Sequence, residues 1–218
     1  MKNIRIAQVL ALAFTIGAIY IAPQPTWAQT SDTYSPVQKT LEYDIRYFIP
    51  NTLHAAGKTF SVSKKFLPEI PLPQTVLGFE VGEKYADWND VLKYMEALQK
   101  HSNRVKIEVM GTTYQHRPII QVTISSTENM RKLDEIKKEH IQLTDASISS
   151  NADVTRMPVV VNLAHSMHGN EASAVNSALA TAYFFAASDD ENIKELLDNT
   201  IIVMAPGLNP DGINRFAN

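Results

Sequence analysis

MPVVVNLAHSMHGNE, residues 157–171, contains the patterns of a strand and of the link that follows it. Its first half, from Met157 to Ala164, is apolar and rich in β-branched valine, which predicts a strand covered on both faces. Apolar residues then recur at helical spacing from Ala172 to Phe185, which predicts a helix. The stretch therefore predicts a buried strand that passes through a short link into a helix.

The link contains His168-Gly169-Asn170-Glu171, a histidine and a glutamate three residues apart. Side chains at this spacing on the first turn of a helix face the same way, so an imidazole nitrogen and a carboxylate can reach one metal ion. Gly169 lets the backbone turn sharply between them. The alternative is a loop histidine bonded to backbone and an acidic residue that favours a helix N-terminus. The spacing alone leaves both interpretations open, because chance often produces it.

His165 offers a second metal pair, because it precedes His168 by three residues. We expect His165 to lie still within the strand. This favours a packing role, or a role behind the ligands, over direct metal binding.

A second motif, Asn209-Pro210-Asp211-Gly212, follows an apolar run at 201–205. Asn-Pro and Asp-Gly are both turn signals, so the motif predicts a tight turn after a strand. Both motifs thus follow strands. In α/β sheets, binding sites gather beyond the carboxyl ends of strands, and the position of both motifs fits that rule.

Helical and strand patterns alternate through the rest of the chain, which predicts an α/β sheet with helices on both faces. The first expected elements are a helix capped by Asp87 with Val91, Leu92, Met95 and Leu98 on one face, strands at 104–110 and 118–125, and a turn at 111–117 between them. The later ones are a helix from the capping box Ser125–Glu128 with Met130, Leu133, Ile136 and Ile141 on one face, a surface loop at 144–156, and a short helix from a second capping box, Ser188–Glu191.

The order HGNE, helix, apolar strand, NPDG and then Arg215 resembles the zinc carboxypeptidases of the carboxypeptidase A type, in their large secreted bacterial branch. The upstream segments LGFEVG (77–82), RVKIEVMG (104–111) and RPIIQVTIS (117–125) are similar to that branch as well. The resemblance covers roughly residues 66–218. One departure is Gln115-His116-Arg117-Pro118, where the family usually has Glu-Gly-Arg-Pro; it bears on the shape of that turn and on no zinc ligand.

The resemblance implies the N-terminal part of a mixed-sheet α/β zinc carboxypeptidase fold with helices on both faces. It implies one zinc ion with His168 and Glu171 as ligands, and Arg215 as the catalytic cation that steadies a developing oxyanion. The alternative for Arg215 is a surface arginine paired with an acid. No histidine follows Glu171, so the third protein ligand and the general-base glutamate are expected beyond Asn218. The 218 residues are therefore expected to be an inactive N-terminal fragment of the enzyme.

The implied activity is removal of C-terminal amino acids from peptides or proteins. Two alternatives stay open: an N-acyl amino acid deacylase of the same fold, and a non-catalytic binding module that keeps a partial zinc site. The net charge of −3 and the even mix of charges do not suggest a nucleic-acid partner.

The N-terminus divides the chain into three expected parts. Lys2 and Arg5, the apolar run 6–22 and Ala28 predict a signal peptide at 1–28, so the protein is expected to be secreted or periplasmic. The alternative of a retained membrane anchor is disfavoured, because the run is shorter than the roughly 20 residues needed to span a membrane. The chain has no cysteine to carry a lipid. A pre-domain segment at 29–80, with Pro68, Pro71 and Pro73 in an extended part, then leads into a catalytic domain at 81–218.

Overall fold

The computed structural model describes residues 51–55 and 58–217, all of which belong to one compact unit, Tyr43–Asn218. The predicted signal peptide and residues 29–50 of the predicted pre-domain segment lie outside the described residues. Within the described part, no helix is long and apolar enough to span a membrane.

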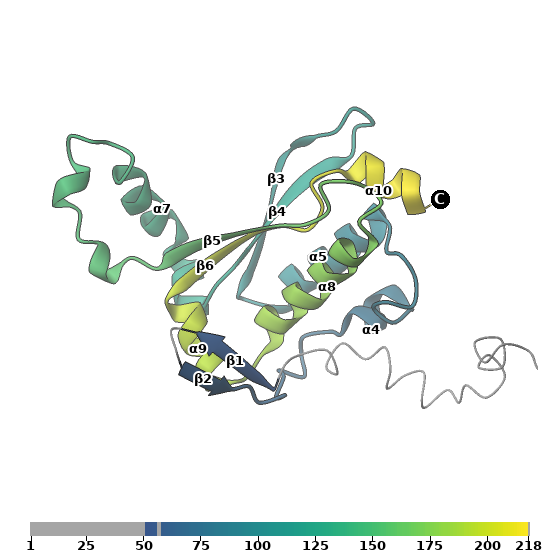
Figure 1. Cartoon of the computed structure of the whole chain (residues 1–218), viewed down its shortest axis with the longest axis horizontal. Coiled ribbons are helices and arrows are strands. Elements are labelled where there is room, and N and C mark those ends of the chain that lie inside the picture. Colours follow the sequence, from purple (N-terminus) through teal and green to yellow (C-terminus); the bar gives the residue numbers. More distant parts are fainter. Residues whose placement is uncertain (1–50, 56–57, 218) are drawn as a thin grey trace, which may run out of the picture. The chain divides into compact units, whose positions relative to one another are not determined.

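Four strands form a mixed sheet in the order β3 (Val105–Thr112), β4 (Pro118–Ile124), β6 (Thr200–Ala205) and β5 (Val159–Ala164). β4 runs antiparallel to both β3 and β6, whereas β5 and β6 are parallel (Figure 1). Parallel neighbours need a crossover connection, which is made here by α8 (Ala172–Ala187) and α9 (Glu191–Asp198). The prediction of an α/β fold built on a mixed sheet is confirmed.

One face of the sheet carries the hydrophobic core, under α5 (Trp88–His101) and α8. α5 begins at Asp87, whose side chain accepts from the Asp90 backbone while the Asp90 side chain accepts from the Asp87 backbone, so the predicted cap is confirmed. The most deeply buried large side chains of the structure are Trp88, Val91, Tyr94, Met95, Leu98, Ile124, Leu179, Ile193, Leu197, Met204 and Ile213. They come from both helices, from β4 and β6, and from the elements beside them, which identifies this face as the main source of hydrophobic stabilisation.

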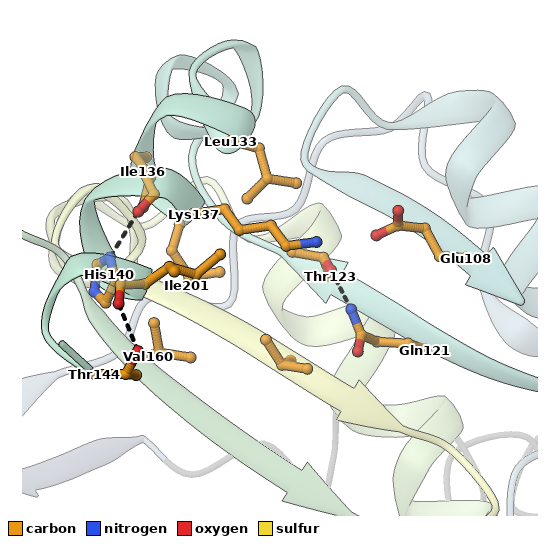
Figure 2. Close-up of a pocket in the computed structure, with 12 residues that line it drawn as sticks. Glu108, Gln121, Thr123, Leu133, Ile136, Lys137, His140, Thr144, Val160 and Ile201 are labelled. Carbon is orange, nitrogen blue, oxygen red and sulfur yellow. Dashed lines mark hydrogen bonds between the residues drawn. The ribbon is translucent and has the colours of Figure 1, made fainter. Parts of the chain in front are cut away.

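The opposite face carries α7 (Leu133–Gln142), which leaves a groove of about 370 Å³ between itself and the sheet (Figure 2). Leu133 and Ile136 line it from the helix, and Val160, Ile201 and Val203 line it from the strands. The His140 ring lies 2.8 Å from the Ile136 carbonyl oxygen and 3.0 Å from the Pro158 carbonyl oxygen, which ties α7 to the start of β5. Helices therefore lie on both faces as predicted, but α7 covers its face only in part.

The prediction that 157–164 is covered on both faces is wrong for the described structure. β5 is an edge strand, and Val159, Val160 and Val161 are 64%, 48% and 38% exposed. Burial of such a run needs a neighbour on each side and a layer on each face. In the part of the chain that is described, β5 pairs with β6 alone.

Both capping boxes predicted around serines are displaced. Ser126 rather than Ser125 caps α6 (Thr127–Arg131), because the Ser125 hydroxyl instead donates to the carbonyl oxygens of Leu197 and Thr200. Asp190 rather than Ser188 caps α9, since its carboxylate accepts from two backbone N–H groups of the first turn. In both cases the residue that caps the helix lies one or two positions after the predicted serine. Hydrogen bonds with distant residues determine which candidate becomes the cap.

The helix expected to run through Met130 to Ile141 is broken at Lys132 into α6 and α7, and Ile141 is exposed. Two further differences lie upstream. A hairpin of β1 (Thr52–Ala55) and β2 (Lys58–Ser61) was not predicted, and α4 (Pro73–Leu77) replaces part of the expected extended segment. The surface loop at 144–156 is confirmed and contains the short 3₁₀ turns Ser149–Asn151 and Val154–Arg156.

Candidate functional site

His168 and Glu171 lie in the link between β5 and α8, and the structure brings them together. The His168 N–H donates to Glu171 Oε2 over 3.0 Å, and the Glu171 N–H donates to the His168 carbonyl oxygen over 3.1 Å. Glu171 is the N-cap residue of α8 but makes no side-chain cap bond. The pair therefore precedes the helix instead of occupying its first turn, and the link folds back on itself to hold the carboxylate beside the histidine backbone.

Ser166 shapes the approach to this link. It is buried and has a φ of +50°, and its hydroxyl donates to the His168 carbonyl oxygen over 3.0 Å. A left-handed backbone is unfavourable for a residue with a side chain. The left-handed residue in the bend out of β5 is thus Ser166, whereas Gly169, where the sequence suggested the sharp turn, has no positive φ.

Gly169 joins the two sequence motifs. A Cβ added to Gly169 would overlap the backbone carbonyl group of Gly212, so the two glycines are in direct backbone contact. The second motif begins α10 (Pro210–Ala217), and Asn209 Oδ1 accepts from the Gly212 N–H over 2.9 Å. The expected tight turn is therefore a helix start, and the structure brings the two motifs into contact beyond the ends of β5 and β6.

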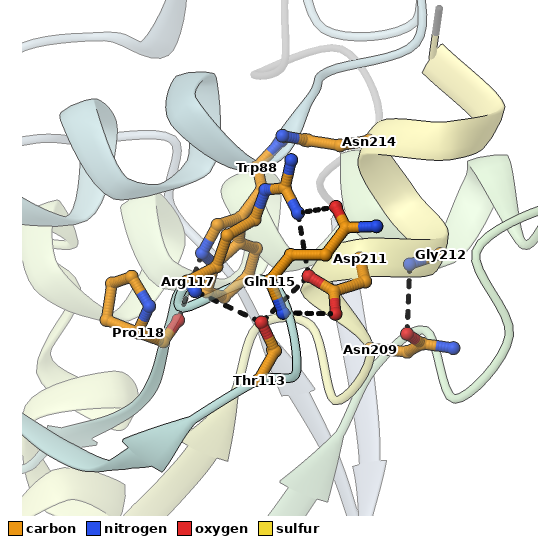
Figure 3. Close-up of polar contacts among 9 residues, drawn as sticks. All are labelled: Trp88, Thr113, Gln115, Arg117, Pro118, Asn209, Asp211, Gly212 and Asn214. Atoms are coloured by element: carbon orange, nitrogen blue, oxygen red, sulfur yellow. Dashed lines mark hydrogen bonds and ion pairs between the residues drawn. The ribbon is translucent and has the colours of Figure 1, made fainter.

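Asp211 of the second motif clamps the turn between β3 and β4 (Figure 3). Its carboxylate accepts from Thr113 Oγ1 (2.8 Å), from Arg117 Nη1 (2.7 Å) and from the Gln115 N–H (3.2 Å). Desolvation alone would raise the pKa of Asp211, but the bonds from Thr113 and Arg117 outweigh it and hold the pKa below its usual value. The carboxylate is thus a fixed anion that joins α10 to the hairpin.

The same hairpin contains the departure from the family sequence. His116, where the family usually has glycine, has a φ of +59°, the left-handed conformation that glycine adopts freely. The Thr113 N–H donates to the Arg117 carbonyl oxygen over 2.9 Å, and the Arg117 N–H donates to Thr113 Oγ1 over 3.0 Å. The turn therefore closes with a histidine in the glycine conformation.

Trp88 attaches α10 to the core. Its backbone N–H donates to Asn214 Oδ1 over 2.8 Å, and its indole N–H donates to the Pro118 carbonyl oxygen over 3.0 Å (Figure 3). A Cβ on Gly207 would lie 2.7 Å from the indole ring, so the chain passes closely over Trp88 before α10. The second motif is held by the core as well as by the hairpin.

Arg215 is exposed on α10. It lies three residues after Gly212 and one before Phe216, and residues at i, i+3 and i+4 share one side of a helix. Gly212, one turn earlier on α10, contacts Gly169 of the HGNE link. Its role as the catalytic cation stays a prediction.

Tyr85 is a site residue that the sequence reasoning missed. Its hydroxyl donates to the Gly169 carbonyl oxygen over 2.6 Å, and its ring packs edge-on against Phe216 with 5.2 Å between centroids. Burial raises the pKa of Tyr85 and the nearby Glu171 carboxylate adds to this, while a hydrogen bond with Ser166 opposes it. No local pattern marks Tyr85 in the sequence, because its partners all come from distant segments.

His165 lies against α8. Its Nδ1 is 3.4 Å from Ser177 Oγ, and burial lowers its pKa. Its backbone extends the pairing of β5, since the N–H donates to the Ala205 carbonyl oxygen and its own carbonyl accepts from Leu208. This geometry favours the packing role over the alternative metal pair.

The donor set suits zinc in kind but is incomplete. An imidazole and a carboxylate held in one turn are typical zinc ligands, and His168 is exposed and accessible. Among residues 51–55 and 58–217, however, no cluster of three or more histidine, cysteine, aspartate or glutamate side chains could hold a metal ion. A catalytic zinc site usually has three protein ligands, and the assignment of His168 and Glu171 as two of them stays a prediction.

The chain is similar in fold to several solved structures. They include a carboxypeptidase A from Helicoverpa armigera (20% identity, TM-score 0.42, covering 64% of this chain and 31% of that chain) and a metallo-carboxypeptidase from Burkholderia cenocepacia (16%, 0.38, 77% and 36%). Thrombin activatable fibrinolysis inhibitor is another (12%, 0.44, 66% and 31%). The chain spans about a third of the length of these structures.

Among curated proteins, a sequence search finds no match. The sequence profile described as Zinc carboxypeptidase matches residues 91–218, which is more than half of the chain and includes both motifs. The chain therefore belongs to the zinc carboxypeptidase family.

Proposed function

We propose that the protein is a zinc-dependent metallocarboxypeptidase that removes C-terminal amino acids from peptides or proteins. The observation that carries the proposal is the backbone contact of Gly169 with Gly212, which sets the His168 and Glu171 pair against α10. This arrangement unites the two motifs of the family in one place, beyond the ends of β5 and β6.

Each residue of the proposed site has a separate role. His168 and Glu171 hold one zinc ion, and the third ligand and the general base come from residues outside these 218. When bound, zinc supplies Lewis acidity toward the scissile carbonyl of a peptide. Arg215 contributes a fixed positive charge from α10 for the oxyanion that develops on that carbonyl. On this proposal the 218 residues alone do not hydrolyse peptides.

We further propose that residues 1–28 are a signal peptide, whose removal would deliver the protein to the periplasm or the medium. Its net charge would change from −3 to −5, because the removed residues include Lys2 and Arg5 and no acidic residue. Peptides that reach that compartment are the proposed substrates.

Zinc titration of the full-length protein tests the proposal. We expect one zinc per chain, with binding lost in His168→Ala and Glu171→Ala. His101→Ala is the matched control, since His101 is also exposed but lies at the end of α5, where its Nδ1 is 2.8 Å from the Ala97 carbonyl oxygen. Unchanged zinc binding in the two site variants would contradict the proposed ligands.

Product analysis separates the alternatives. Release of terminal amino acids from peptides supports the carboxypeptidase, and release of acyl groups from N-acyl amino acids indicates the deacylase. Zinc binding without either reaction indicates a binding module.

A further inference from the structure

Tyr85 lies where three distant segments meet: the HGNE link, α10 and the approach to α5. We propose that Tyr85 is a positioning residue for the zinc ligands, and that its hydroxyl fixes the peptide group between His168 and Glu171 while its ring couples that group to α10. The inference rests on the proposed zinc site, and deepens it by naming what holds the ligand pair in place.

The acceptor of the Tyr85 hydroxyl is the reason to assign it this role. The bond of 2.6 Å reaches the carbonyl oxygen of Gly169, which lies between the two ligand residues in sequence. A glycine has wide backbone freedom, so a peptide group next to Gly169 is the part of the link most able to rotate. A short hydrogen bond at that carbonyl opposes the rotation and so limits where the His168 and Glu171 side chains can lie.

Tyr85 can hold the link in place because the residues on either side of it contact the core helices or are buried. The carbonyl oxygen of Lys84 accepts from Asn176 Nδ2 on α8 over 3.3 Å, and Lys84 Nζ lies 3.5 Å from the Asp90 carboxylate on α5. Ala86 follows fully buried, immediately before the cap of α5. The segment is thus fixed to both core helices, and the tyrosine carries that rigidity to the link.

The ring gives a second connection. Tyr85 meets Phe216 at an interplanar angle of 77°, an edge-on geometry that aromatic pairs favour. Phe216 follows Arg215 directly on α10. Gly169 also touches Gly212 at the start of that helix, so the HGNE link and α10 are joined at two points, one by backbone and one through Tyr85. The proposed ligands and the proposed cation would therefore keep a fixed relation to each other.

The hydroxyl is suited to act as a donor. Burial raises the pKa of Tyr85, so the phenol keeps its proton at neutral and mildly alkaline pH. Polar groups that lie behind metal ligands and orient them commonly affect metal affinity by about 10- to 100-fold when removed.

Tyr85→Phe in the full-length protein tests the proposal, because it keeps the ring against Phe216 and removes only the hydroxyl. Tyr94→Phe is the matched control. The Tyr94 hydroxyl also donates to a backbone carbonyl, that of Pro71 over 3.1 Å, but in the core and away from the link. Three quantities are measured: amide hydrogen exchange at His168 and Glu171 in the zinc-free protein, the zinc dissociation constant by competition with a chelator, and the thermal unfolding midpoint.

We expect Tyr85→Phe to accelerate exchange at the two link amides and to weaken zinc binding by about tenfold. Tyr94→Phe is expected to leave amide exchange and zinc affinity unchanged, even if it lowers the unfolding midpoint as much as Tyr85→Phe does. Equal exchange and zinc affinity in the two variants would overturn the positioning role. The wild-type protein tests the proposed zinc site separately from the role of Tyr85. If the wild type bound no zinc, both the proposed function and the positioning role would be wrong, whatever the variants do.

Discussion

Asp211 and His168 occupy comparable places, since each follows a strand of the sheet at or near the start of a helix, yet they are held in opposite ways. The Asp211 carboxylate accepts hydrogen bonds from three residues of the β3–β4 turn, and its side chain is only 21% exposed. His168 is exposed, and its contacts are made by its backbone. The hydrogen bonds of Asp211 thus fix α10 against the β3–β4 turn, whereas the side chain of the proposed ligand His168 stays accessible.

The division has a physical reason. A histidine ligand must keep the lone pair of one ring nitrogen available, so that nitrogen cannot accept a hydrogen bond from a protein donor. Its position has to be set by neighbours instead. Here those neighbours are Ser166, Tyr85 and the glycine pair, whereas the Asp211 carboxylate accepts three hydrogen bonds from the β3–β4 turn.

The largest expected effect comes from Gly169→Ala, which disrupts the backbone contact between the HGNE link and α10. The new methyl group would overlap the Gly212 backbone, and a backbone cannot move aside as a flexible side chain can. We expect a loss of more than about 3 kcal/mol in the free energy of unfolding, by overpacking at a rigid site. Denaturant unfolding measures it.

Gly111→Ala is the control for that change. Gly111 lies in β3 without a positive φ, and a Cβ there would meet no atom within 4 Å. Its unfolding free energy should stay close to that of the wild type. A similar loss in both variants would show that the effect comes from glycine replacement in general and not from the meeting of the motifs.

A smaller effect is expected from Asp211→Asn, which weakens the attachment of α10 to the β3–β4 turn and does not change the HGNE link. The amide keeps the shape but loses the charge that Arg117 Nη1 pairs with at 2.7 Å. We expect the thermal unfolding midpoint to fall by a few degrees. Asp145→Asn is the control, because Asp145 also has a lowered pKa, caused by Ser147, but lies in the exposed 144–156 loop.

The pH dependence of stability follows from the same carboxylate. The pKa of Asp211 in the folded protein is below its unfolded value, so its contribution is fully present above the unfolded pKa of about 3.9 and is lost as the pH falls through the folded pKa. Between neutral pH and pH about 4 the difference in stability between wild type and Asp211→Asn should be constant, and it should shrink below that. A difference that stayed constant down to the lowest pH would contradict the assignment.

The smallest effects compare the two left-handed residues. His116→Gly removes backbone strain in the turn and should stabilise the protein by about 0.5–1 kcal/mol, after the entropy cost of glycine. Ser166→Gly removes similar strain but also the hydroxyl bond to the His168 carbonyl oxygen, worth about 1 kcal/mol, so its net effect should be near zero. Chemical denaturation of both variants measures the contrast. Equal stabilisation by both would mean that the Ser166 hydroxyl does not help to hold the link.

The sequence predicts most of the regular structure because its patterns are local. The face of α5, its cap at Asp87, the strands β3, β4 and β6 and the helix α8 all follow from periodicity and cap signals that neighbouring residues carry. The displaced caps show the limit of such signals. Where several capping residues stand together, as at Ser188 and Asp190, the choice depends on tertiary bonds that the sequence does not display.

The site divides in the same way. His168 and Glu171 could be singled out by their spacing and by the second motif. Tyr85 could not, because its position near Gly169 depends on the path of the chain between two core helices. The Gly169 and Gly212 contact was equally hidden, since glycines signal freedom of the backbone and not the partner that the freedom accommodates.

The three exposed valines of β5 have a consequence for the protein in solution. Residues 159–164 contain no proline and no charged residue. Natural edge strands use such residues to discourage pairing with another chain. In the described part of the molecule, this strand therefore combines open backbone hydrogen-bonding groups with apolar side chains on both faces. For a chain of these 218 residues alone, we therefore predict that β5 promotes association with other chains and that Val159→Lys would reduce it.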